Sequence, residues 1–163
     1  MLREKVVFVT GAGSGFGKRM SELYAQNGAW GVAADIADDN GRQTVGLIKK
    51  NGGKAVYIRT DVGNPADCEN LVKETVHHFG KLDIAFNNAG IAGEPKPVGE
   101  YPVETWDKLI QVNLSGVFYC LRYQIPEMIK AGGGVIVNMA STFGLVGFAG
   151  ASAYVAAKHG IIG

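Results

Sequence analysis

A tyrosine and a lysine near the end of the chain have the spacing of a proton-transfer pair. Tyr154 and Lys158 are four residues apart, so a helix would place them on one face. A phenol with an ordinary pKa of about 10 is a poor acid or base at neutral pH, and a cation beside it favours the phenolate form. Ser141 follows an apolar run, where its hydroxyl could hold a substrate oxygen. Each feature alone has a plain alternative: a chance pair, and an ordinary serine at the end of a strand.

A second candidate chemistry is phosphate binding, in the glycine-rich segment from Thr10 to Gly17. This segment follows an apolar run and opens an amphipathic stretch, which predicts a turn from a strand into a helix. Glycines let the backbone approach a phosphate closely, and the N-terminus of the helix attracts its negative charge. We therefore expect a bound dinucleotide here rather than a glycine turn needed only for packing. The expected contacts are Gly11, Gly13, Ser14, Gly15, Phe16 and Gly17.

An acidic residue follows at the predicted end of the second strand. Asp35 lies where a carboxylate can accept hydrogen bonds from the adenosine ribose of a dinucleotide. The same carboxylate would repel a 2′-phosphate, no arginine or lysine stands next to it, and Ser14 in the loop is neutral. These features predict NAD rather than NADP as the cofactor. The alternative is that Asp35 only caps the following turn.

The elements that position these residues alternate along the chain. Apolar runs bounded by glycines and turn residues predict strands, and segments of helical periodicity between them predict helices. Such alternation indicates an α/β fold with a parallel sheet and helices on both faces, as one domain over residues 1–163. The predicted strands are 5–10, 30–35, 54–61, 81–90 and 132–141, and the predicted helices are 16–27, 38–51, 65–80, 103–131 and one from about 150 onward. Pro126 is expected to kink the fourth helix or to end it early.

Asn113 interrupts the apolar stripe of that long helix. A buried amide must be hydrogen-bonded or it lowers stability, so Asn113 needs a partner. Spacing alone favours a structural partner over a place in a proton path. The stripe consists of Val103, Trp106, Leu109, Ile110, Val117 and Leu121.

Composition excludes several classes of function. The net charge is +1 and no basic run exceeds two residues, which argues against nucleic acid or a charged membrane surface as a partner. The segment from Lys130 to Lys158 encloses no charge, but its six glycines and its polar residues fit a buried strand, a loop and a helix start better than a membrane span. Cys68 and Cys120 have no metal-binding spacing and indicate reduced core thiols of a cytoplasmic protein. The three histidines make no credible metal site.

Five motifs in order resemble those of the classical short-chain dehydrogenases/reductases, from the first strand to the last residue. The glycine loop fits the family pattern Thr-Gly-x-x-x-Gly-x-Gly. The other motifs are Asp61-Val62, the run Asn87 to Gly90, Asn113, and Ser141 with Tyr154-x-x-x-Lys158. The resemblance implies a doubly wound parallel sheet (Rossmann fold), hydride transfer between NAD(H) and a secondary alcohol or ketone, and a homotetramer or dimer.

The resemblance also implies a role for each matching residue. Tyr154 would be the acid/base, Lys158 would favour its phenolate form and hold the nicotinamide ribose, and Ser141 would orient the substrate oxygen. Asn113 would anchor a water chain that relays protons, which reverses the preference from spacing alone. The remaining cofactor contacts would be Asp61 and Val62 beside the adenine, and Asn87, Ala89 and Gly90 on the floor beside the cofactor.

The chain departs from the family in length. Members usually run to about 250 residues, so we expect the chain to be incomplete at its C-terminus and to lack the usual last strands. Residues that select the substrate are expected in Ala92–Pro102 and near Gly144–Gly150. A competing hypothesis is a dinucleotide-binding or scaffolding module without turnover, against which the intact set of Ser141, Tyr154 and Lys158 argues.

Overall fold

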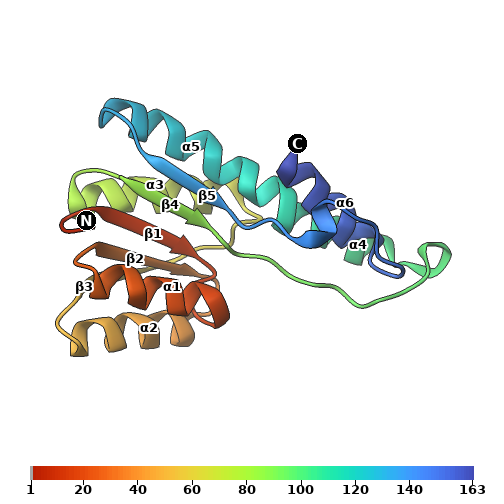
Figure 1. Ribbon diagram of the computed structural model, residues 1–163, viewed down its shortest axis with the longest axis horizontal. Coiled ribbons are helices and arrows are strands. Elements are labelled where there is room, and N and C mark those ends of the chain that lie inside the picture. Colours follow the sequence, from red (N-terminus) through yellow and green to blue (C-terminus); the bar gives the residue numbers. More distant parts are fainter. Residues whose placement is uncertain (1) are drawn as a thin grey trace.

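A parallel sheet forms the centre of the computed structural model, which describes residues 2–163 (Figure 1). Its strand order is β3-β2-β1-β4-β5, and every neighbouring pair is parallel. The chain therefore builds outward from β1 in one direction and then in the other, which confirms the predicted doubly wound sheet. The strands are β1 (Val6–Thr10), β2 (Trp30–Asp35), β3 (Lys54–Arg59), β4 (Ile84–Asn87) and β5 (Val135–Asn138).

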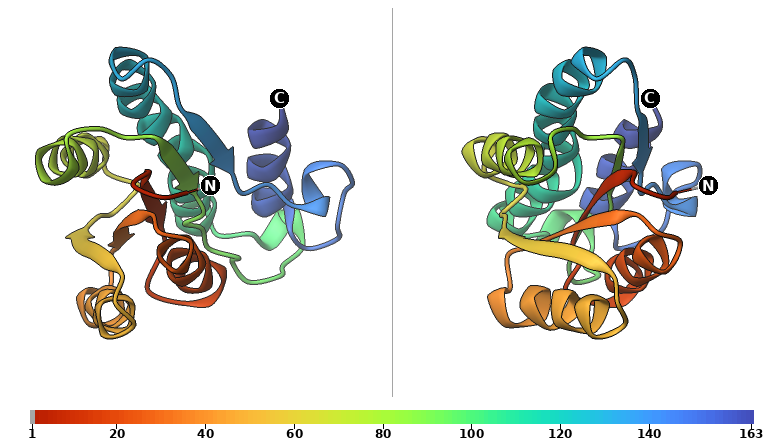
Figure 2. Two further views of the ribbon diagram at one scale, coloured as in Figure 1. Left: turned by 60° about the vertical axis from the view of Figure 1, so that its left-hand side comes forward. Right: turned by 90° about the vertical axis from the view of Figure 1, so that its left-hand side faces the viewer.

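Helices cover both faces of the sheet, except at β5, where Val135 and Val137 remain exposed. In Figure 2, α1 and α2 lie on one side of the strands, and α3 and α5 lie on the other. The alternation of side chains along β1 explains this arrangement: Val7 and Val9 belong to the core under α1 and α2, whereas Phe8 belongs to the core under α3 and α5. The helices are α1 (Gly15–Gln26), α2 (Asp38–Lys50), α3 (Pro65–Phe79), α4 (Val103–Ile110), α5 (Gly116–Lys130) and α6 (Ser152–Ile162), with short turns η1 (Val98–Glu100) and η3 (Thr142–Gly144).

Local sequence signals set the ends of α3 as predicted. The side chain of Asn64 accepts a hydrogen bond from the Ala66 N–H at 2.9 Å, and Pro65 occupies the first helical position. Gly80 ends the helix in the left-handed conformation, with φ of 79°. The helix that connects β3 to β4 is thus fixed at both ends by residues that the sequence makes conspicuous.

The predicted long helix over 103–131 is present as a continuous helical run from Val103 to Lys130, with three differences in detail. A π-helical segment, η2 (Gln111–Ser115), separates α4 from α5. Pro126 does not end the helix early, since α5 continues to Lys130. The proline has no N–H to donate to the carbonyl of Arg122, and both residues are exposed to water. Val103 and Trp106 of the expected apolar stripe are exposed, because only the end of α4 near Leu109 packs against α6.

The uncharged segment 131–157 forms β5, η3 and the first half of α6, as its glycines and polar residues predicted. Across residues 2–163, none of the helices combines the length and the apolar character needed to span a bilayer. The segment instead places Ser141 after the last strand and Tyr154 on the last helix. Figure 1 shows α6 beside α4, beyond the end of β5.

Candidate active site

The glycine loop between β1 and α1 uses its glycines for different purposes. Gly11 and Gly15 have positive φ values of 67° and 50°, which residues with side chains rarely adopt. A Cβ at Gly17 would overlap the carbonyl oxygen of Gly11, so this glycine lets α1 pack against the loop. A Cβ at Gly13 would lie 2.9 Å from Oδ2 of Asp35. Nothing lies within 4 Å of a Cβ built on Gly15, where the loop faces open space.

A cleft of about 430 Å³ lies against this loop at the carboxyl ends of the strands, where doubly wound sheets bind their ligands. A side-chain-free loop, a helix N-terminus and a carboxylate at the end of β2 together suit a dinucleotide. Most of the predicted cofactor residues line the cleft: Gly11, Ser14, Gly15, Phe16, Asp35, Asp61, Val62, Ala89 and Gly90. Asn88, within the predicted run Asn87 to Gly90, also lines the cleft, as do five residues that the sequence did not indicate: Ile36, Thr60, Ile91, Lys108 and Val112.

Five predicted cofactor residues do not line the cleft: Tyr154 and Lys158, which lie on α6, and Gly13, Gly17 and Asn87. Gly13 and Gly17 shape the loop from behind, as their close neighbours show. Asn87 is buried in an amide network, in which its Nδ2 donates to Asn138 and its Oδ1 accepts from Gln124 at 2.7 Å. Asn87 thus ties β4 to β5 and α5 beneath the cleft.

Asn88, the next residue, ties the end of β4 to the glycine loop. Its Nδ2 donates to the Thr10 carbonyl at 2.9 Å. The backbone N–H groups of Asn88 and Ala89 donate to the Thr10 hydroxyl oxygen at 3.0 and 3.1 Å. The two strands on either side of the topological switch point are therefore cross-linked at the cleft.

Asp35 joins the loop to β2 and also caps the turn that follows. Its Oδ2 accepts from the Gly13 N–H at 2.7 Å, and its Oδ1 accepts from the Ala37 N–H at 2.9 Å. The capping role that the sequence left as an alternative is therefore present together with a place in the cleft. The Tyr57 hydroxyl donates to the Asp35 carbonyl at 2.8 Å. Burial, with Asp38 and Asp35 nearby, raises the pKa of Tyr57 to about 12.

Tyr154 and Lys158 lie on one face of α6, as their spacing predicted. The Lys158 Nζ is 5.6 Å from the centre of the Tyr154 ring. It donates a hydrogen bond to the Met139 carbonyl at 2.6 Å, which fixes it beside β5. Lys158 is only 4% exposed, and this burial lowers its pKa. The site thus holds a nearly buried cation next to a phenol.

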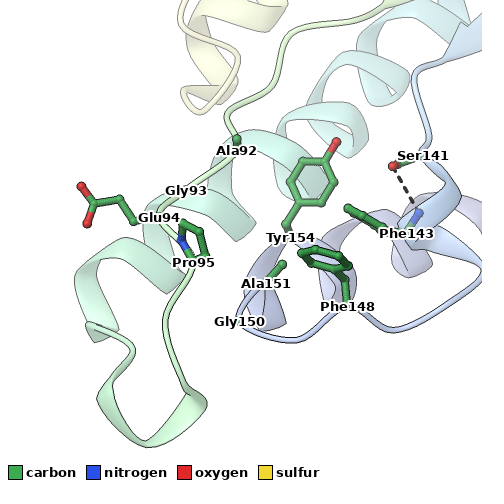
Figure 3. Close-up of a pocket in the computed structure, with 10 residues that line it drawn as sticks. All are labelled: Ala92, Gly93, Glu94, Pro95, Ser141, Phe143, Phe148, Gly150, Ala151 and Tyr154. Atoms are coloured by element: carbon green, nitrogen blue, oxygen red, sulfur yellow. Dashed lines mark hydrogen bonds between the residues drawn. The ribbon is translucent and has the colours of Figure 1, made fainter.

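Ser141 and Tyr154 line the same cavity, of about 320 Å³ (Figure 3). The Ser141 Oγ accepts a hydrogen bond from the Phe143 N–H at 3.2 Å, so its own O–H proton is available for a substrate oxygen. The remaining lining residues are Ala92, Gly93, Glu94, Pro95, Phe143, Phe148, Gly150 and Ala151. They lie in, or directly beside, the two segments Ala92–Pro102 and Gly144–Gly150, where substrate selection was expected.

The Asn113 side chain has a structural partner. It is fully buried in the π-helical segment, and its Oδ1 accepts from the Ile91 N–H at 2.8 Å. Its Nδ2 donates to the Ile91 carbonyl at 2.7 Å. Both polar atoms of the amide are therefore bound to the backbone that follows β4, so the amide fixes the segment between the two cavities.

Cys68 and Cys120 are buried free cysteines whose sulfurs are 3.7 Å apart. The hydrogen bond to Cys68 and burial both raise the pKa of the Cys120 thiol, so it stays in the unreactive thiol form. Over the described residues, 2–163, no three histidine, cysteine or acidic side chains are grouped to hold a metal ion.

Comparison with known proteins agrees with this geometry. The family model described as short chain dehydrogenase matches residues 5–163. The cyclohexanol dehydrogenase of Acinetobacter sp. (strain SE19) is 45% identical over 159 residues, which cover 98% of this chain and 63% of that enzyme. The 3beta-hydroxysteroid dehydrogenase of Mediterraneibacter gnavus is 39% identical over 160 residues, covering 98% of this chain and 58% of that enzyme.

A solved structure of NAD⁺-bound xylitol dehydrogenase superposes with a TM-score of 0.96 at 31% identity, covering 99% of this chain and 62% of that protein. The chain thus spans roughly three-fifths of the length of these relatives. The match of the family model extends from the strand before the glycine loop to the helix that carries Tyr154 and Lys158. The chain therefore belongs to the short-chain dehydrogenase family.

Proposed function

We propose that the whole protein is an oxidoreductase acting on CH–OH groups, with NAD(H) and a small secondary alcohol or ketone as its substrates. The observation that carries this proposal is that Ser141 and Tyr154 line one cavity while the buried Lys158 lies beside the Tyr154 ring. The cleft at the glycine loop suits the dinucleotide. When bound, NAD supplies a ring carbon that accepts a hydride from the carbinol carbon.

In alcohol oxidation, the residues of this chain orient the hydroxyl group and take its proton. The Ser141 O–H donates to the substrate oxygen, since its Oγ already accepts from Phe143. The Tyr154 oxygen takes the hydroxyl proton, and the ammonium of Lys158 favours the phenolate that must form. The Met139 carbonyl keeps this ammonium in place. In ketone reduction, Tyr154 returns the proton to the substrate oxygen.

Proton exchange with solvent is assigned to the region of Asn113. The Asn113 amide is bound to Ile91, so its side chain supports a proton path by fixing the π-helical segment rather than by moving protons itself. π-Helical turns inside helices are frequent at functional sites. A water chain that starts from this segment and reaches Lys158 is the arrangement we propose.

NAD is the proposed cofactor because Asp35 lies in the cleft at the end of β2. Its carboxylate can accept hydrogen bonds from ribose hydroxyls and repels a 2′-phosphate. The NAD⁺-bound state of the xylitol dehydrogenase structure is in keeping with this choice. The proposed cofactor contacts are the nine predicted residues that line the cleft, together with Tyr154 and Lys158.

Secondary alcohols are the proposed substrates, in keeping with the ring alcohols after which two relatives, the cyclohexanol dehydrogenase and the 3beta-hydroxysteroid dehydrogenase, are named. The proposal also places the protein in the cytoplasm, which the buried free thiols of Cys68 and Cys120 support. It includes a single dinucleotide-binding domain over residues 1–163.

A homotetramer or dimer completes the proposal. Phe118, Ile125 and Ile129 form an exposed apolar stripe along α5, at the spacing of one helix face. A stripe of this kind marks an interaction surface, and a second copy of the chain is the simplest occupant. Sedimentation of the full-length protein as a monomer would contradict this part of the proposal.

The test of the activity uses the full-length protein, NAD and a panel of secondary alcohols, with the absorbance of the reduced cofactor as the readout. Replacing Tyr154 by Phe should lower kcat by about 10²–10⁴-fold, the usual contribution of a positioned acid/base. Tyr24→Phe on α1, away from both cavities, is the control and should keep full activity. Undiminished turnover in Tyr154→Phe would refute the mechanism, and NAD binding without turnover on any alcohol would favour a binding module.

A further inference from the structure

Two phenylalanine rings form one wall of the cavity that contains Ser141 and Tyr154. Phe143 and Phe148 stack with their ring centres 4.6 Å apart and their planes 22° apart. Phe143 also meets the Tyr154 ring edge to face, at 6.3 Å. Phe148 nevertheless remains 56% exposed, although it lines the cavity. The wall thus presents an apolar surface, and the described chain leaves its Phe148 ring largely exposed (Figure 3).

This aromatic wall is fixed relative to the reacting groups. Phe143 is held to Ser141 by the hydrogen bond from its own N–H. The next residue, Gly144, packs against α6 so closely that a Cβ there would lie 2.6 Å from the Lys158 carbonyl oxygen. The turn that carries Phe143 is therefore anchored on the helix that carries Tyr154, and Phe148 is joined to this turn by its stacking on Phe143.

The opposite wall of the cavity is also mostly apolar, and a hydrogen bond joins it to the loop that carries the aromatic wall. It consists of Ala92 to Pro95, and the Lys96 N–H donates to the Gly150 carbonyl at 2.9 Å, which joins the two walls. Of the described residues that line the cavity, only Glu94 carries a charge. Its side chain is 83% exposed, and Figure 3 shows its carboxylate turned away from Tyr154. Ser141 and Tyr154 therefore supply the polar side-chain contacts, enough for one substrate oxygen.

The cavity has room for a ring-sized ligand. Its volume is about 320 Å³, whereas an apolar cavity of about 150 Å³ is enough to bind benzene. One ring with short substituents, or two fused rings, fits this space. A rigid ring also loses less conformational freedom between two fixed walls than an open chain of the same carbon count.

We infer that this cavity selects an uncharged alicyclic secondary alcohol, or the corresponding ketone, whose ring packs on the Phe143–Phe148 wall while its single oxygen meets Ser141 and Tyr154. This inference rests on the proposed function and assigns Phe148 as a specificity-determining residue. A charged group or a further hydroxyl on the ring would be desolvated there without a partner, so charged and polyhydroxylated alcohols are rejected.

The experiment compares kcat/KM of the full-length enzyme with NAD for cyclohexanol, 3-hexanol and cis-4-hydroxycyclohexanecarboxylate. We expect cyclohexanol to exceed 3-hexanol by about ten-fold and the carboxylate by about a hundred-fold or more. Phe148→Ala should lower the value for cyclohexanol by about ten-fold, mainly through KM, and that for 3-hexanol by less than about three-fold. Leu145→Ala is the control, since Leu145 is 72% exposed in the same loop but does not line the cavity.

A binding measurement separates this inference from the proposed function. Saturation-transfer NMR with cyclohexanone should show ring contacts in the wild type and in Leu145→Ala, and their loss in Phe148→Ala. Turnover that is equal for the three alcohols, or unchanged selectivity in Phe148→Ala, overturns the inference and leaves the oxidoreductase function standing. Ring contacts that depend on Phe148, without turnover of any alcohol, support the inference for the cavity and overturn the proposed catalysis.

Discussion

The carboxylate of Asp35 accepts a hydrogen bond from the backbone N–H of Gly13 at 2.7 Å, across the gap between β2 and the glycine loop. A residue proposed to select the cofactor thus also shapes the loop proposed to hold its phosphates. The same carboxylate accepts from Ala37, so both its oxygens are already engaged. Because each carboxylate oxygen has more than one lone pair, it can still accept from a ribose hydroxyl.

Asp35→Ala should weaken NAD binding and raise the relative affinity for NADP. The loss for NAD should be about ten-fold or more, because a hydrogen bond to a charged group contributes about 1.5–3 kcal/mol. Removal of the negative charge also removes the repulsion of a 2′-phosphate. Calorimetric titration with both cofactors measures their dissociation constants. The Kd for NADP divided by the Kd for NAD should fall in the variant.

Asp39→Ala is the matched control. Asp39 is exposed on α2, so its replacement removes one nearby negative charge without changing a contact to the glycine loop. If it changed the ratio as much as Asp35→Ala does, net charge rather than position would explain the preference. An unchanged ratio in Asp35→Ala would remove the assignment of NAD.

Gly17→Ala should destabilise the protein, whereas Gly46→Ala should stabilise it. Both glycines lie in helices, but a Cβ at Gly17 overlaps the Gly11 carbonyl, and one at Gly46 meets nothing within 4 Å. We expect a loss of about 1–3 kcal/mol at Gly17 from overpacking and a gain of about 0.5–1 kcal/mol at Gly46 from the lower entropy of the unfolded chain. Urea unfolding measures both, and shifts of the same sign would contradict the packing role of Gly17.

The sequence predicts most strongly what short segments determine. The spacing of Tyr154 and Lys158 suffices to place them on one helix face, and the glycines between β1 and α1 suffice to predict the cleft. By contrast, Asn87 and Asn88 are adjacent residues with identical side chains. Only the tertiary fold determines that Asn87 joins an amide network and that Asn88 binds Thr10. The π-helical segment at Asn113 is likewise outside local prediction, because its partner Ile91 lies on a distant loop.

The aromatic wall shows the same division. The sequence indicates which loops would select the substrate, but the stacking of Phe143 on Phe148 depends on how η3 packs against α6. Side-chain orientation in loops follows contacts made with other elements, and a periodic pattern carries no information about those contacts. The sequence of a loop therefore predicts where the substrate cavity lies, whereas the arrangement of side chains in the cavity can be read only from the folded structure.

Gln124→Leu should loosen β5, because Gln124 is fully buried and joins α5 to the amide network of Asn87 and Asn138. Loss of its Nε2 leaves Asn87 Oδ1 without its donor, which should cost about 1–3 kcal/mol. β5 is paired with β4, while Val135 and Val137 on it are exposed, so faster amide exchange should concentrate in this strand. Gln26→Leu, at an exposed position of α1, is the control. Uniform exchange rates across the sheet in Gln124→Leu would show that the network has no local effect.

Stability should depend on pH through Lys158. Burial lowers the pKa of this lysine below its ordinary value of 10.5, so between the lowered pKa and pH 10.5 the folded state binds fewer protons than the unfolded state. The free energy of unfolding therefore gains a contribution that is complete above pH 10.5 and is lost as the pH falls through the lowered pKa. The wild type should gain stability relative to Lys158→Met as the pH rises from neutral to 10.5.

Lys158→Met also loses the hydrogen bond to Met139. This loss shifts the free energy of unfolding at every pH, whereas titration of the ammonium changes the slope of that free energy against pH. Lys73→Met provides a control of opposite sign. The hydrogen bond to Glu69 on the exposed surface raises the pKa of Lys73, so its small contribution is present below pH 10.5 and is lost as the pH rises further. Urea unfolding of the three proteins from neutral pH to above pH 10.5 measures the slopes; the slope due to Lys158 lies below pH 10.5 and that due to Lys73 above it. Parallel curves for the wild type and Lys158→Met would mean that burial imposes no penalty on the ammonium, and the charge beside Tyr154 would then be as well solvated as a surface lysine.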